Sequence, residues 1–148
     1  MTNKVLKPGW VTFAGAGPGA PDLLTVRCRD AIAEADVIVY AGSLVAPEVL
    51  AGAAFGCRLY DSAAMALPAI TETLINAARQ GLKVLRLHTG DPSLYGATAE
   101  QMAALDRDAI PHEMIPGVSA VFAAAAALRA ELTLPEISQT LILSRRGG

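Results

Sequence analysis

Three glycine-bearing segments of this sequence have the residue types of a ligand site, and each follows a run of apolar residues. They are residues 15–20 (GAGPGA), 88–96 (HTGDPSLYG) and 116–120 (PGVSA). Glycine lets a ligand approach the backbone closely, and free backbone N–H groups can face that ligand. In a parallel α/β sheet such loops gather at the carboxyl ends of the strands, where ligands bind. We therefore expect the three segments to share one edge of a sheet.

The first segment fits the dinucleotide pattern G-x-G-x-x-A, but two features argue against a nicotinamide or flavin. Pro18 removes one backbone N–H from a phosphate cradle. The acidic residue expected at the end of the second strand is missing, because Ala41 stands there and Asp36 precedes the strand. We favour a loop that a flat ligand approaches, and a tight turn without a ligand is the alternative.

The second and third segments each allow a functional and a structural interpretation. Asp91 could face a ligand, or it could accept backbone N–H groups within its own turn. His88 could act as a general base, although a histidine next to a strand end is more often structural. Ser119 is a good N-cap for the following helix, and its hydroxyl or N–H could also reach a ligand. The catalytic residue stays unknown.

Composition narrows the class of protein. The chain has 148 residues, of which 53% are hydrophobic and 18% charged, and this fits one globular domain. A net charge of -2 without a basic run argues against nucleic acid. The longest apolar run, residues 120–128, is about half of the ~18 residues that span a bilayer, and no secretory signal is visible, so we expect a cytoplasmic protein. Cys28 and Cys57 stand outside any Cys/His cluster, which predicts core residues and no metal site.

Apolar runs alternate with segments of helical period, which predicts an α/β fold with a mostly parallel sheet flanked by helices. Asp22 is expected to cap the first long helix, and Gly81 to close the helix over 67–78. The predicted strands cover residues 10–14, 37–40, 58–60, 83–89, 112–115 and 140–144, and the other helices begin at Pro47, Ala97 and Ser119. Because the last strand lies at the end of the sequence, we expect the natural chain to continue.

The set of motifs resembles a known family. Residues 13–25 (FAGAGPGAPDLLT), 35–40 (ADVIVY), 90–92 (GDP) and 116–120, in this order, are similar to the tetrapyrrole methylases, which use S-adenosylmethionine and have a fold unlike that of Rossmann-type methyltransferases. Residues 40–45 (YAGSLV), 60–63 (YDSA), 88–96 and 132–140 (LTLPEISQT) resemble one branch, the precorrin-4 C11-methyltransferases of cobalamin synthesis. The resemblance covers nearly all of the chain.

The resemblance implies roles for individual residues. The proton-handling residue is not identified, because sister enzymes that methylate uroporphyrinogen carry an acid where this sequence has Ala41. Arg86 and Arg129 are candidate partners for the carboxylates of the macrocycle. The cofactor-binding residues implied by the resemblance are Pro18, Thr89, Gly90, Asp91, Leu94, Ser119 and Ala120, and the substrate-binding residues are Gly15, Gly17, Gly19 and Tyr95.

The resemblance also implies a domain organisation. Residues 1–132 would form the N-terminal methylase domain, and residues 133–148 a linker and the first strand of a truncated second α/β domain. That second domain supplies much of the adenosine pocket in the family, so we expect the 148-residue chain alone to bind S-adenosylmethionine weakly or not at all. The full-length protein is expected to be a homodimer. The alternatives are another tetrapyrrole substrate such as uroporphyrinogen III, a dinucleotide-binding domain, and a folded but non-catalytic chain.

Overall fold

The computed structural model describes residues 4–145 and is built on one sheet of five parallel strands. The strand order is β3-β2-β4-β1-β5, so the first strand lies between two later ones. The predicted α/β fold with a parallel sheet is confirmed. The strands are β1 (Val11–Gly15), β2 (Val37–Tyr40), β3 (Arg58–Asp61), β4 (Val84–His88) and β5 (His112–Ile115).

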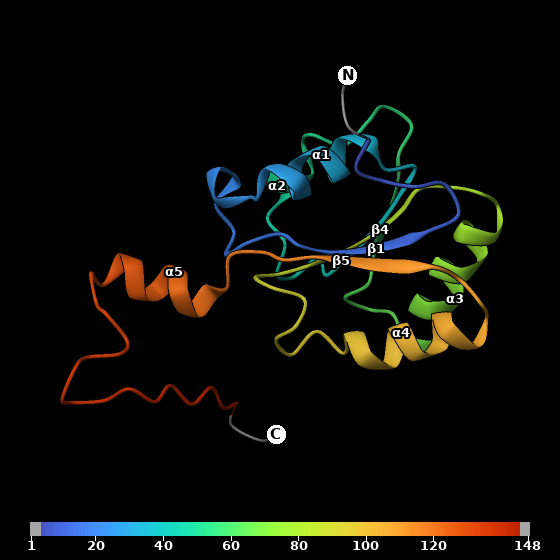
Figure 1. Cartoon of the computed structure of the whole chain (residues 1–148). Helices are drawn as coiled ribbons and strands as arrows, with labels where there is room; N and C mark the ends of the chain where they lie inside the picture. The colour runs from blue at the N-terminus through green and yellow to red at the C-terminus, as the bar shows by residue number, and fades with distance from the viewer. Residues whose placement is uncertain (1–3, 146–148) are drawn as a thin grey trace.

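Helices cover both faces of this sheet and make a three-layer body (Figure 1). On one face lie α1 (Val26–Glu34) and the short α2 (Pro47–Leu50). On the other face lie α3 (Leu67–Arg79) and α4 (Thr98–Arg107). The fifth helix, α5 (Ala120–Ala127), leaves the body at the edge where β5 ends. The chain therefore consists of a layered body and a projecting C-terminal segment.

Alternate side chains of the central strands point to opposite faces of the sheet, so each face has its own hydrophobic core. Val11 and Phe13 of β1 belong to the core cluster under α3 and α4, whereas Ala14 belongs to the cluster under α1. Both Val11 and Phe13 are fully buried. Because β1 and β4 are covered on both faces, every residue of both strands is buried, including Arg86 and His88 of β4. This arrangement holds the carboxyl ends of the strands in a fixed register.

The first long helix begins later than the sequence predicts. Thr25, and not Asp22, is its N-cap, because the Thr25 side chain accepts a hydrogen bond from the backbone N–H of Cys28 at 3.1 Å. Asp22 instead lies in a short 3-10 helix, η1 (Pro21–Leu23), which Pro21 opens. The predicted cap of α5 is confirmed, since the Ser119 hydroxyl accepts from the N–H of Val121. Cys28 is a buried core residue, as predicted, and Cys57 is half-buried.

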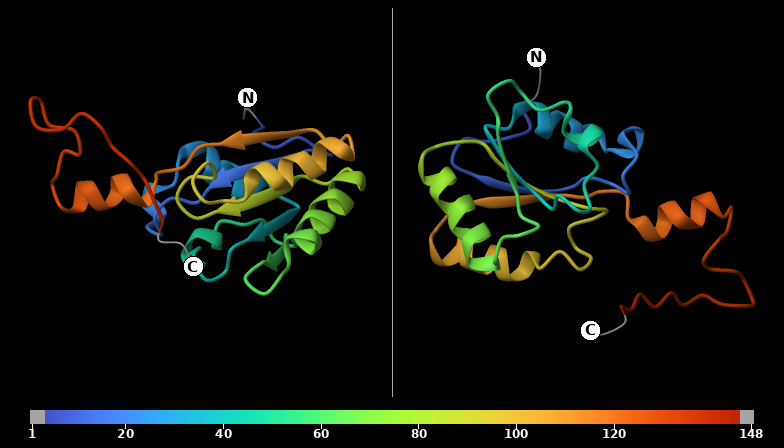
Figure 2. Two further views of the ribbon diagram at one scale, coloured as in Figure 1. Left: turned by 90° about the horizontal axis from the view of Figure 1, so that it is seen from below. Right: turned by 180° about the vertical axis from the view of Figure 1, so that it is seen from behind.

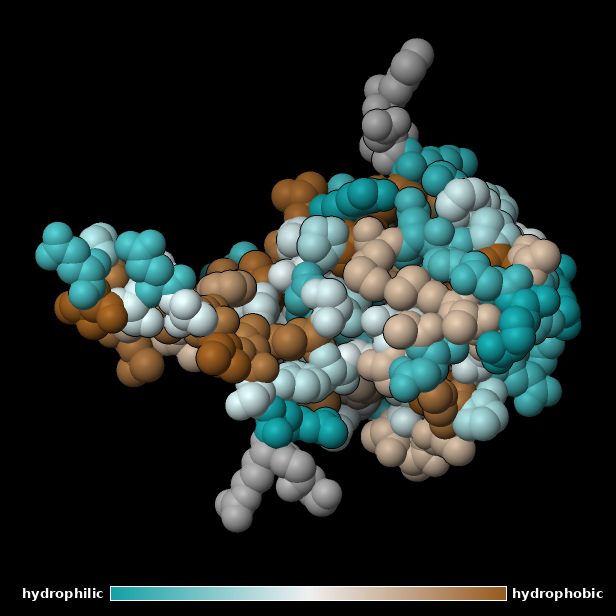
Figure 3. Space-filling view, turned by 60° about the horizontal axis from the view of Figure 1, so that its bottom comes forward, coloured by the Kyte–Doolittle hydropathy of each residue, from teal (hydrophilic) through white to brown (hydrophobic). Residues whose placement is uncertain are grey.

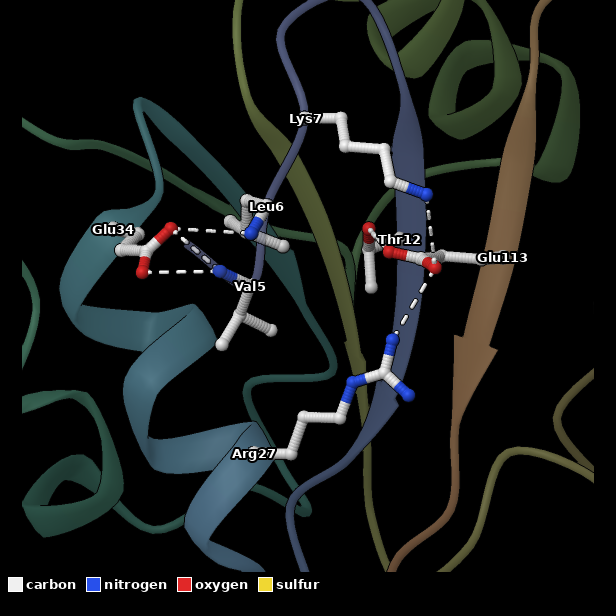
Figure 4. Close-up of polar contacts among 7 residues, drawn as sticks. All are labelled: Val5, Leu6, Lys7, Thr12, Arg27, Glu34 and Glu113. Carbon is white, nitrogen blue, oxygen red and sulfur yellow. Dashed lines mark hydrogen bonds and ion pairs between the residues drawn. The ribbon is translucent and has the colours of Figure 1, made fainter. Parts of the chain in front are cut away.

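Two glutamates attach the N-terminal segment to the body (Figure 4). The Glu34 carboxylate at the end of α1 accepts from the backbone N–H groups of Val5 and Leu6, each at 3.1 Å. Glu113 of β5 contacts Lys7 at 3.6 Å and the guanidinium of α1 residue Arg27 at 3.3 Å. Leu6 is buried beside α1 as a result. Residues 5–7 are thus part of the body.

The projecting C-terminal segment, residues 120–145, has little contact with the body (Figure 2). Ala125 is the only buried residue of α5, and Leu128, Ile137 and Ile142 are each about 80% exposed. Hydrophobic atoms therefore gather on its surface (Figure 3). The predicted strand over 140–144 is wrong for the structure described, which is irregular there. A strand needs a neighbour to pair its backbone groups, and residues 140–144 pair with none of the strands within 4–145.

Candidate functional site

The loops after β1 and β4 are joined directly through their backbones. The N–H of Gly90 donates to the carbonyl of Gly17 at 2.7 Å, and the N–H of Gly17 donates to the carbonyl of Gly90 at 3.2 Å. Within a parallel sheet this is a local antiparallel bridge. Both glycines have positive φ, +69° for Gly17 and +58° for Gly90, a region that L side chains adopt at a cost. The bridge therefore depends on glycine at both positions.

A third loop joins this bridge at a junction of Gly15, Gly90 and Gly117, which we name the glycine junction. A Cβ on Gly117 would lie 2.1 Å from the Gly90 carbonyl oxygen and 2.7 Å from the Cα of Gly15. A Cβ on Gly15 would lie 2.4 Å from the same oxygen. No side chain fits at such distances, so the three backbones pack against one another. The expectation that the three segments meet at one edge is confirmed.

The carboxylate of Asp91 stabilises the glycine junction through hydrogen bonds. One carboxylate oxygen accepts from the N–H of Gly117 at 2.8 Å, and the other accepts from the N–H of Ser93 at 2.9 Å and from its hydroxyl. Partial burial by itself raises the pKa of Asp91, but these hydrogen bonds outweigh it and hold the pKa below its usual value. Asp91 is therefore ionised, and its carboxylate links the loop after β4 to the loop after β5.

A small pocket opens beside this carboxylate. Its volume is about 180 Å³, which is below the ~300 Å³ at which pockets for whole cofactors begin. Phe122 and Leu143, both in the projecting C-terminal segment, form apolar walls of the pocket that were not predicted from the sequence. The pocket is suited to part of a ligand and is lined by Asp91, Ser93, Leu94, Gly117, Ser119, Phe122 and Leu143.

The structure brings most of the predicted site residues together. Ala120 and Ser119 lie close to Gly90. A Cβ on Gly90 would be 3.5 Å from the N of Ala120 and 3.7 Å from the Cα of Ser119. Two predicted residues lie apart from the junction. A Cβ on Gly19 would meet nothing within 4 Å, and Tyr95 is 57% exposed. The residues gathered at or next to the junction are Gly15, Gly17, Gly90, Asp91, Leu94, Ser119 and Ala120, while Pro18 and Thr89 are half-buried in the adjoining turns.

His88 lies beneath the second loop and does not have the properties of a general base. Its ring is buried and stacks on Phe13, with ring centroids 6.0 Å apart. Burial, helped by the positive charge of Arg86, lowers the pKa of His88 to about 3. Its Nε2 is buried and has no hydrogen-bond partner within residues 4–145. A neutral, enclosed imidazole of this kind fits the structural interpretation.

Arg86, one of the two arginines considered for substrate carboxylates, lies inside the protein. It is 5% exposed, and its guanidinium donates to the carbonyl of Val39, the hydroxyl of Ser62 and the side chain of Gln101. Burial lowers its pKa to about 10, so it stays protonated at neutral pH. Because its donors already face these acceptors, the hypothesis that Arg86 binds the macrocycle is wrong for this structure. Arg129, the second candidate, follows α5 and is exposed.

A carboxylate that sequence reasoning did not assign lies at the same edge. Asp61, the last residue of β3, accepts from the backbone N–H of Gly42 at 2.9 Å and from that of Ala63 at 2.8 Å. A Cβ on Gly42 would lie 2.1 Å from an oxygen of this carboxylate. The signal in the sequence was an acidic residue directly after a short strand. Asp61 therefore places a carboxyl group beside Gly42, the residue that follows Ala41.

Two general features of the described residues concern lipid bilayers and metal ions. Within residues 4–145, each helix is too short or too polar to cross a lipid bilayer. Across the same residues, histidine, cysteine and acidic side chains do not gather in groups of three that could hold a metal ion. The edge described above consists of backbone groups, small polar side chains and apolar side chains.

Comparison with known proteins gives one consistent result. The sequence model of the tetrapyrrole (corrin/porphyrin) methylases matches residues 11–148. The chain is 52% identical over 138 residues to the cobalt-precorrin-4 C(11)-methyltransferase of Methanocaldococcus jannaschii, covering 93% of this chain and 53% of that protein. It is 53% identical over 135 residues to the precorrin-4 C(11)-methyltransferase of Pseudomonas aeruginosa, covering 91% and 54%.

Solved structures agree with the sequence comparison. A cobalt precorrin-4 methyltransferase matches with a TM-score of 0.90 and 45% identity, over 95% of this chain and 59% of the other. A uroporphyrin-III C-methyltransferase from Thermus thermophilus, solved with S-adenosylhomocysteine, matches with a TM-score of 0.72 and 34% identity, over 88% and 52%. The chain thus spans about half the length of the curated relatives it matches.

Proposed function

The chain belongs to the tetrapyrrole (corrin/porphyrin) methylases, and from this premise we propose that it is part of an S-adenosylmethionine-dependent methyltransferase. The proposed substrate is precorrin-4 or its cobalt form, methylated at C11 in cobalamin biosynthesis. The observation that carries the proposal is the glycine junction, which presents backbone rather than side chains at the carboxyl edge of the sheet. Among the solved structures, an identity of 45% to a cobalt precorrin-4 methyltransferase, against 34% to a uroporphyrin enzyme, favours this substrate.

The residues present fit part of the proposed cofactor. The pocket of about 180 Å³ is too small for all of S-adenosylmethionine, so it would hold one portion against Asp91, Leu94 and Ser119. The first N–H groups of a helix have no partner within the helix, so the amide of Ala120 is placed to meet an anionic group. The N–H of Gly90 is already bonded to Gly17, so we propose that Gly90 contacts the cofactor through close approach of its backbone, with Pro18 and Thr89 beside it. The remaining contacts would come from residues outside those described.

The glycines would admit the substrate. We propose that Gly15, Gly17 and Gly19 border the flat macrocycle. Gly19 has open space where a Cβ would lie, whereas Gly15 and Gly17 are buried and would act by letting the loop backbones pack closely behind the ring. Tyr95 is exposed on the loop after Asp91 and would contact the rim of that ring. When bound, S-adenosylmethionine supplies an electrophilic methyl group. The protein then has to align a ring carbon with it, and such alignment can lower a barrier by about 7–11 kcal/mol without a titratable side chain.

The organisation of the whole protein is also a proposal. We infer that residues 1–132 form the N-terminal domain and that residues 133–148 lead to a second α/β domain. The exposed apolar surface of α5 supports a further contact in the full protein, for which we propose a homodimer. Sedimentation of the full-length protein would test this, and a monomer at micromolar concentration would contradict it.

The function is tested by methyl transfer to three substrates. The chain is assayed alone and fused to the part of the P. aeruginosa relative that follows the matched region. S-adenosylmethionine with a 13C-labelled methyl group is offered with precorrin-4, cobalt-precorrin-4 or uroporphyrinogen III. We expect NMR to locate the label at C11 of a precorrin-4 product. Label at C2 or C7 of uroporphyrinogen would overturn the substrate, and NADH binding without a response to S-adenosylmethionine would overturn the class.

Two variants and one binding measurement sharpen this test. Gly117→Ala disrupts the glycine junction and is expected to abolish methyl transfer, whereas Gly52→Ala, whose Cβ would only make an ordinary contact with Ile32 at 4.0 Å, should keep it. For the 148-residue chain alone we expect weak S-adenosylmethionine binding or none. Calorimetry that showed micromolar affinity for this chain would contradict the expectation that a second domain supplies much of the cofactor site.

A further inference from the structure

We propose that Arg86 and Gln101 are positioning residues that fix the backbone of residues 95–97, and with it the Tyr95 side chain, where a tetrapyrrole would contact it. The two side chains form a buried relay from β4 through α4 to this loop. The nature of the ligand rests on the proposed function, whereas the positioning of the loop does not.

The loop of residues 95–97 has a backbone that needs support. Tyr95 and Ala97 have positive φ values of 57° and 48°, in the left-handed region that side chains disfavour. Gly96 between them has no room for a side chain, since a Cβ would lie 2.6 Å from the carbonyl oxygen of Pro92. Such a conformation persists only where the surroundings hold it.

Gln101 provides that support from inside the body. Its side chain is 1% exposed, and its Nε2 donates to the carbonyl of Ala97 at 3.1 Å and to that of Gly96 at 3.3 Å. Thr98 adds a third contact, because its buried hydroxyl donates to the carbonyl of Pro92 at 3.2 Å. The carbonyl groups of Gly96 and Ala97 are therefore held by a side chain of α4.

Arg86 determines which way the Gln101 amide points. Its Nε donates to Oε1 of Gln101 at 3.1 Å. A guanidinium can only donate hydrogen bonds, so the amide oxygen has to face Arg86 and the NH2 group has to face the loop. The guanidinium is fixed in turn by the carbonyl of Val39 at 3.2 Å and the hydroxyl of Ser62 at 3.1 Å. The relay thus connects the ends of β2 and β3 with the loop before α4.

Burying the charged guanidinium of Arg86 costs free energy that apolar side chains at the same place would not cost. Within residues 4–145, Arg86 has no carboxylate within ion-pair distance, although its guanidinium is buried and charged. A buried charge without an opposite charge destabilises a protein unless neutral hydrogen-bond acceptors surround it. Here the acceptors lead to one exposed loop. Since local rules of packing are broken mainly at functional sites, we assign the relay to the loop that carries Tyr95.

The variant Gln101→Glu separates positioning from stability. A glutamate keeps an acceptor for Arg86 and adds a charge partner, but it cannot donate to the Gly96 and Ala97 carbonyls. Gln101→Met removes both contacts. Thr71→Val is the matched control, because Thr71 is also buried on a helix under the sheet and its hydroxyl donates within α3, to the carbonyl of Leu67, and not to the loop of residues 95–97.

The first readout is 19F NMR of the chain labelled with 3-fluorotyrosine. Three resonances are expected, for Tyr40, Tyr60 and Tyr95, and Tyr95→Phe assigns the third. We expect Gln101→Glu to shift and broaden the Tyr95 resonance and to leave the other two unchanged, while Thr71→Val changes none. An unchanged Tyr95 resonance in Gln101→Glu and Gln101→Met would overturn the proposal.

The second readout is kinetic and uses the fused protein described above. We expect Gln101→Glu to raise KM for the tetrapyrrole about tenfold, with KM for S-adenosylmethionine changed less than twofold, because a misplaced binding group costs affinity for the ligand it touches. Equal changes in both constants would reduce Gln101 to a structural role. If the unmodified protein methylates no tetrapyrrole, the proposed function fails, and the NMR result still decides whether the relay holds the loop.

Discussion

The glycine junction and the projecting segment are both rich in small residues, yet they behave in opposite ways. At the junction, Gly15, Gly90 and Gly117 pack so closely that no Cβ fits. In α5 a run of alanines, 123–127, contributes one buried residue. Small residues allow close approach, but approach occurs only where a partner is held in place. At the junction, the parallel sheet holds the three loops against one another. Within residues 4–145, few residues pack against α5.

The two regions also differ in what fixes their local structure. Asp91 links the loops of the junction through hydrogen bonds between residues distant in sequence. The helix α5 is defined by local features, the Ser119 cap and the helix propensity of alanine. We therefore expect small changes at the junction, such as one added methyl group or one lost hydrogen bond, to lower the stability of the body. Changes in the projecting segment should alter that stability little. The following changes test that difference in order of expected effect.

Gly117→Ala should destabilise the body most. The added methyl group would lie 2.1 Å from the Gly90 carbonyl oxygen and 2.7 Å from the Cα of Gly15. Both are backbone atoms, which cannot rotate away as a side chain can. We expect the free energy of unfolding to fall by about 3 kcal/mol or more. Urea denaturation followed by circular dichroism measures this. Gly52→Ala is the control, and equal stabilities of the two variants would show that the loops do not pack as described.

Lowering the pH should destabilise the body through His88. Its pKa in the folded protein, about 3, is below the 6.5 of an unfolded chain. Stability is fully present above pH 6.5 and is lost as the pH falls toward 3, because the unfolded chain then binds a proton more readily. Between pH 7 and pH 5 we expect a loss of about 2 kcal/mol. His88→Gln should show a smaller loss between the same pH values, and a loss equal to that of the original protein would rule out His88 as its cause.

Asp91→Ala should have a smaller effect on stability. It removes the acceptor for the N–H groups of Gly117 and Ser93, which are partly open to water, so we expect a cost of about 1–2 kcal/mol. Asp91→Asn keeps an acceptor oxygen and should cost less. Thermal unfolding at pH 7 measures both. If the two variants were equally destabilised, the charge rather than the hydrogen bonds would hold the loops together.

Removal of residues 131–148 should change the stability of the body least, by less than about 0.5 kcal/mol. The residues removed within the described range are all exposed, and α5 keeps its C-cap. Removal of residues 1–7 is the matched control, since it deletes buried Leu6 and the contacts to Glu34 and should cost more. A large loss on removing the C-terminal residues would contradict the division between body and projecting segment.

Sequence reasoning located the elements of the body well, because alternation and helical period report burial on a covered sheet. The strands over 37–40 and 112–115 and the helix from Leu67 were predicted within a residue. It failed where structure depends on a partner outside the local pattern. Thr25 caps α1 in place of Asp22 because of a turn of 3-10 helix, and residues 140–144 have strand composition without a strand beside them.

For the candidate site, the sequence predicted which loops meet but not how. The glycine spacing indicated a common edge, whereas the contact of Gly15 with Gly117 depends on β1 lying between β4 and β5, an order that the sequence pattern does not encode. The direction of Arg86 could not be predicted either. Its position in β4 gives the face of the sheet, but only the positions of Ser62 and Gln101 show that its charge points inward.

The bridge between Gly17 and Gly90 has a consequence for the order of folding. It joins loops that are far apart in the chain, and Gly117 completes the contact only after β5 has been added to the sheet. Contacts of high sequence separation form late, because the loss of chain entropy precedes the gain from packing. A nascent chain that ends before β5 would therefore have helices and a partial sheet but no complete edge, so ligand binding at this edge would report that folding has finished.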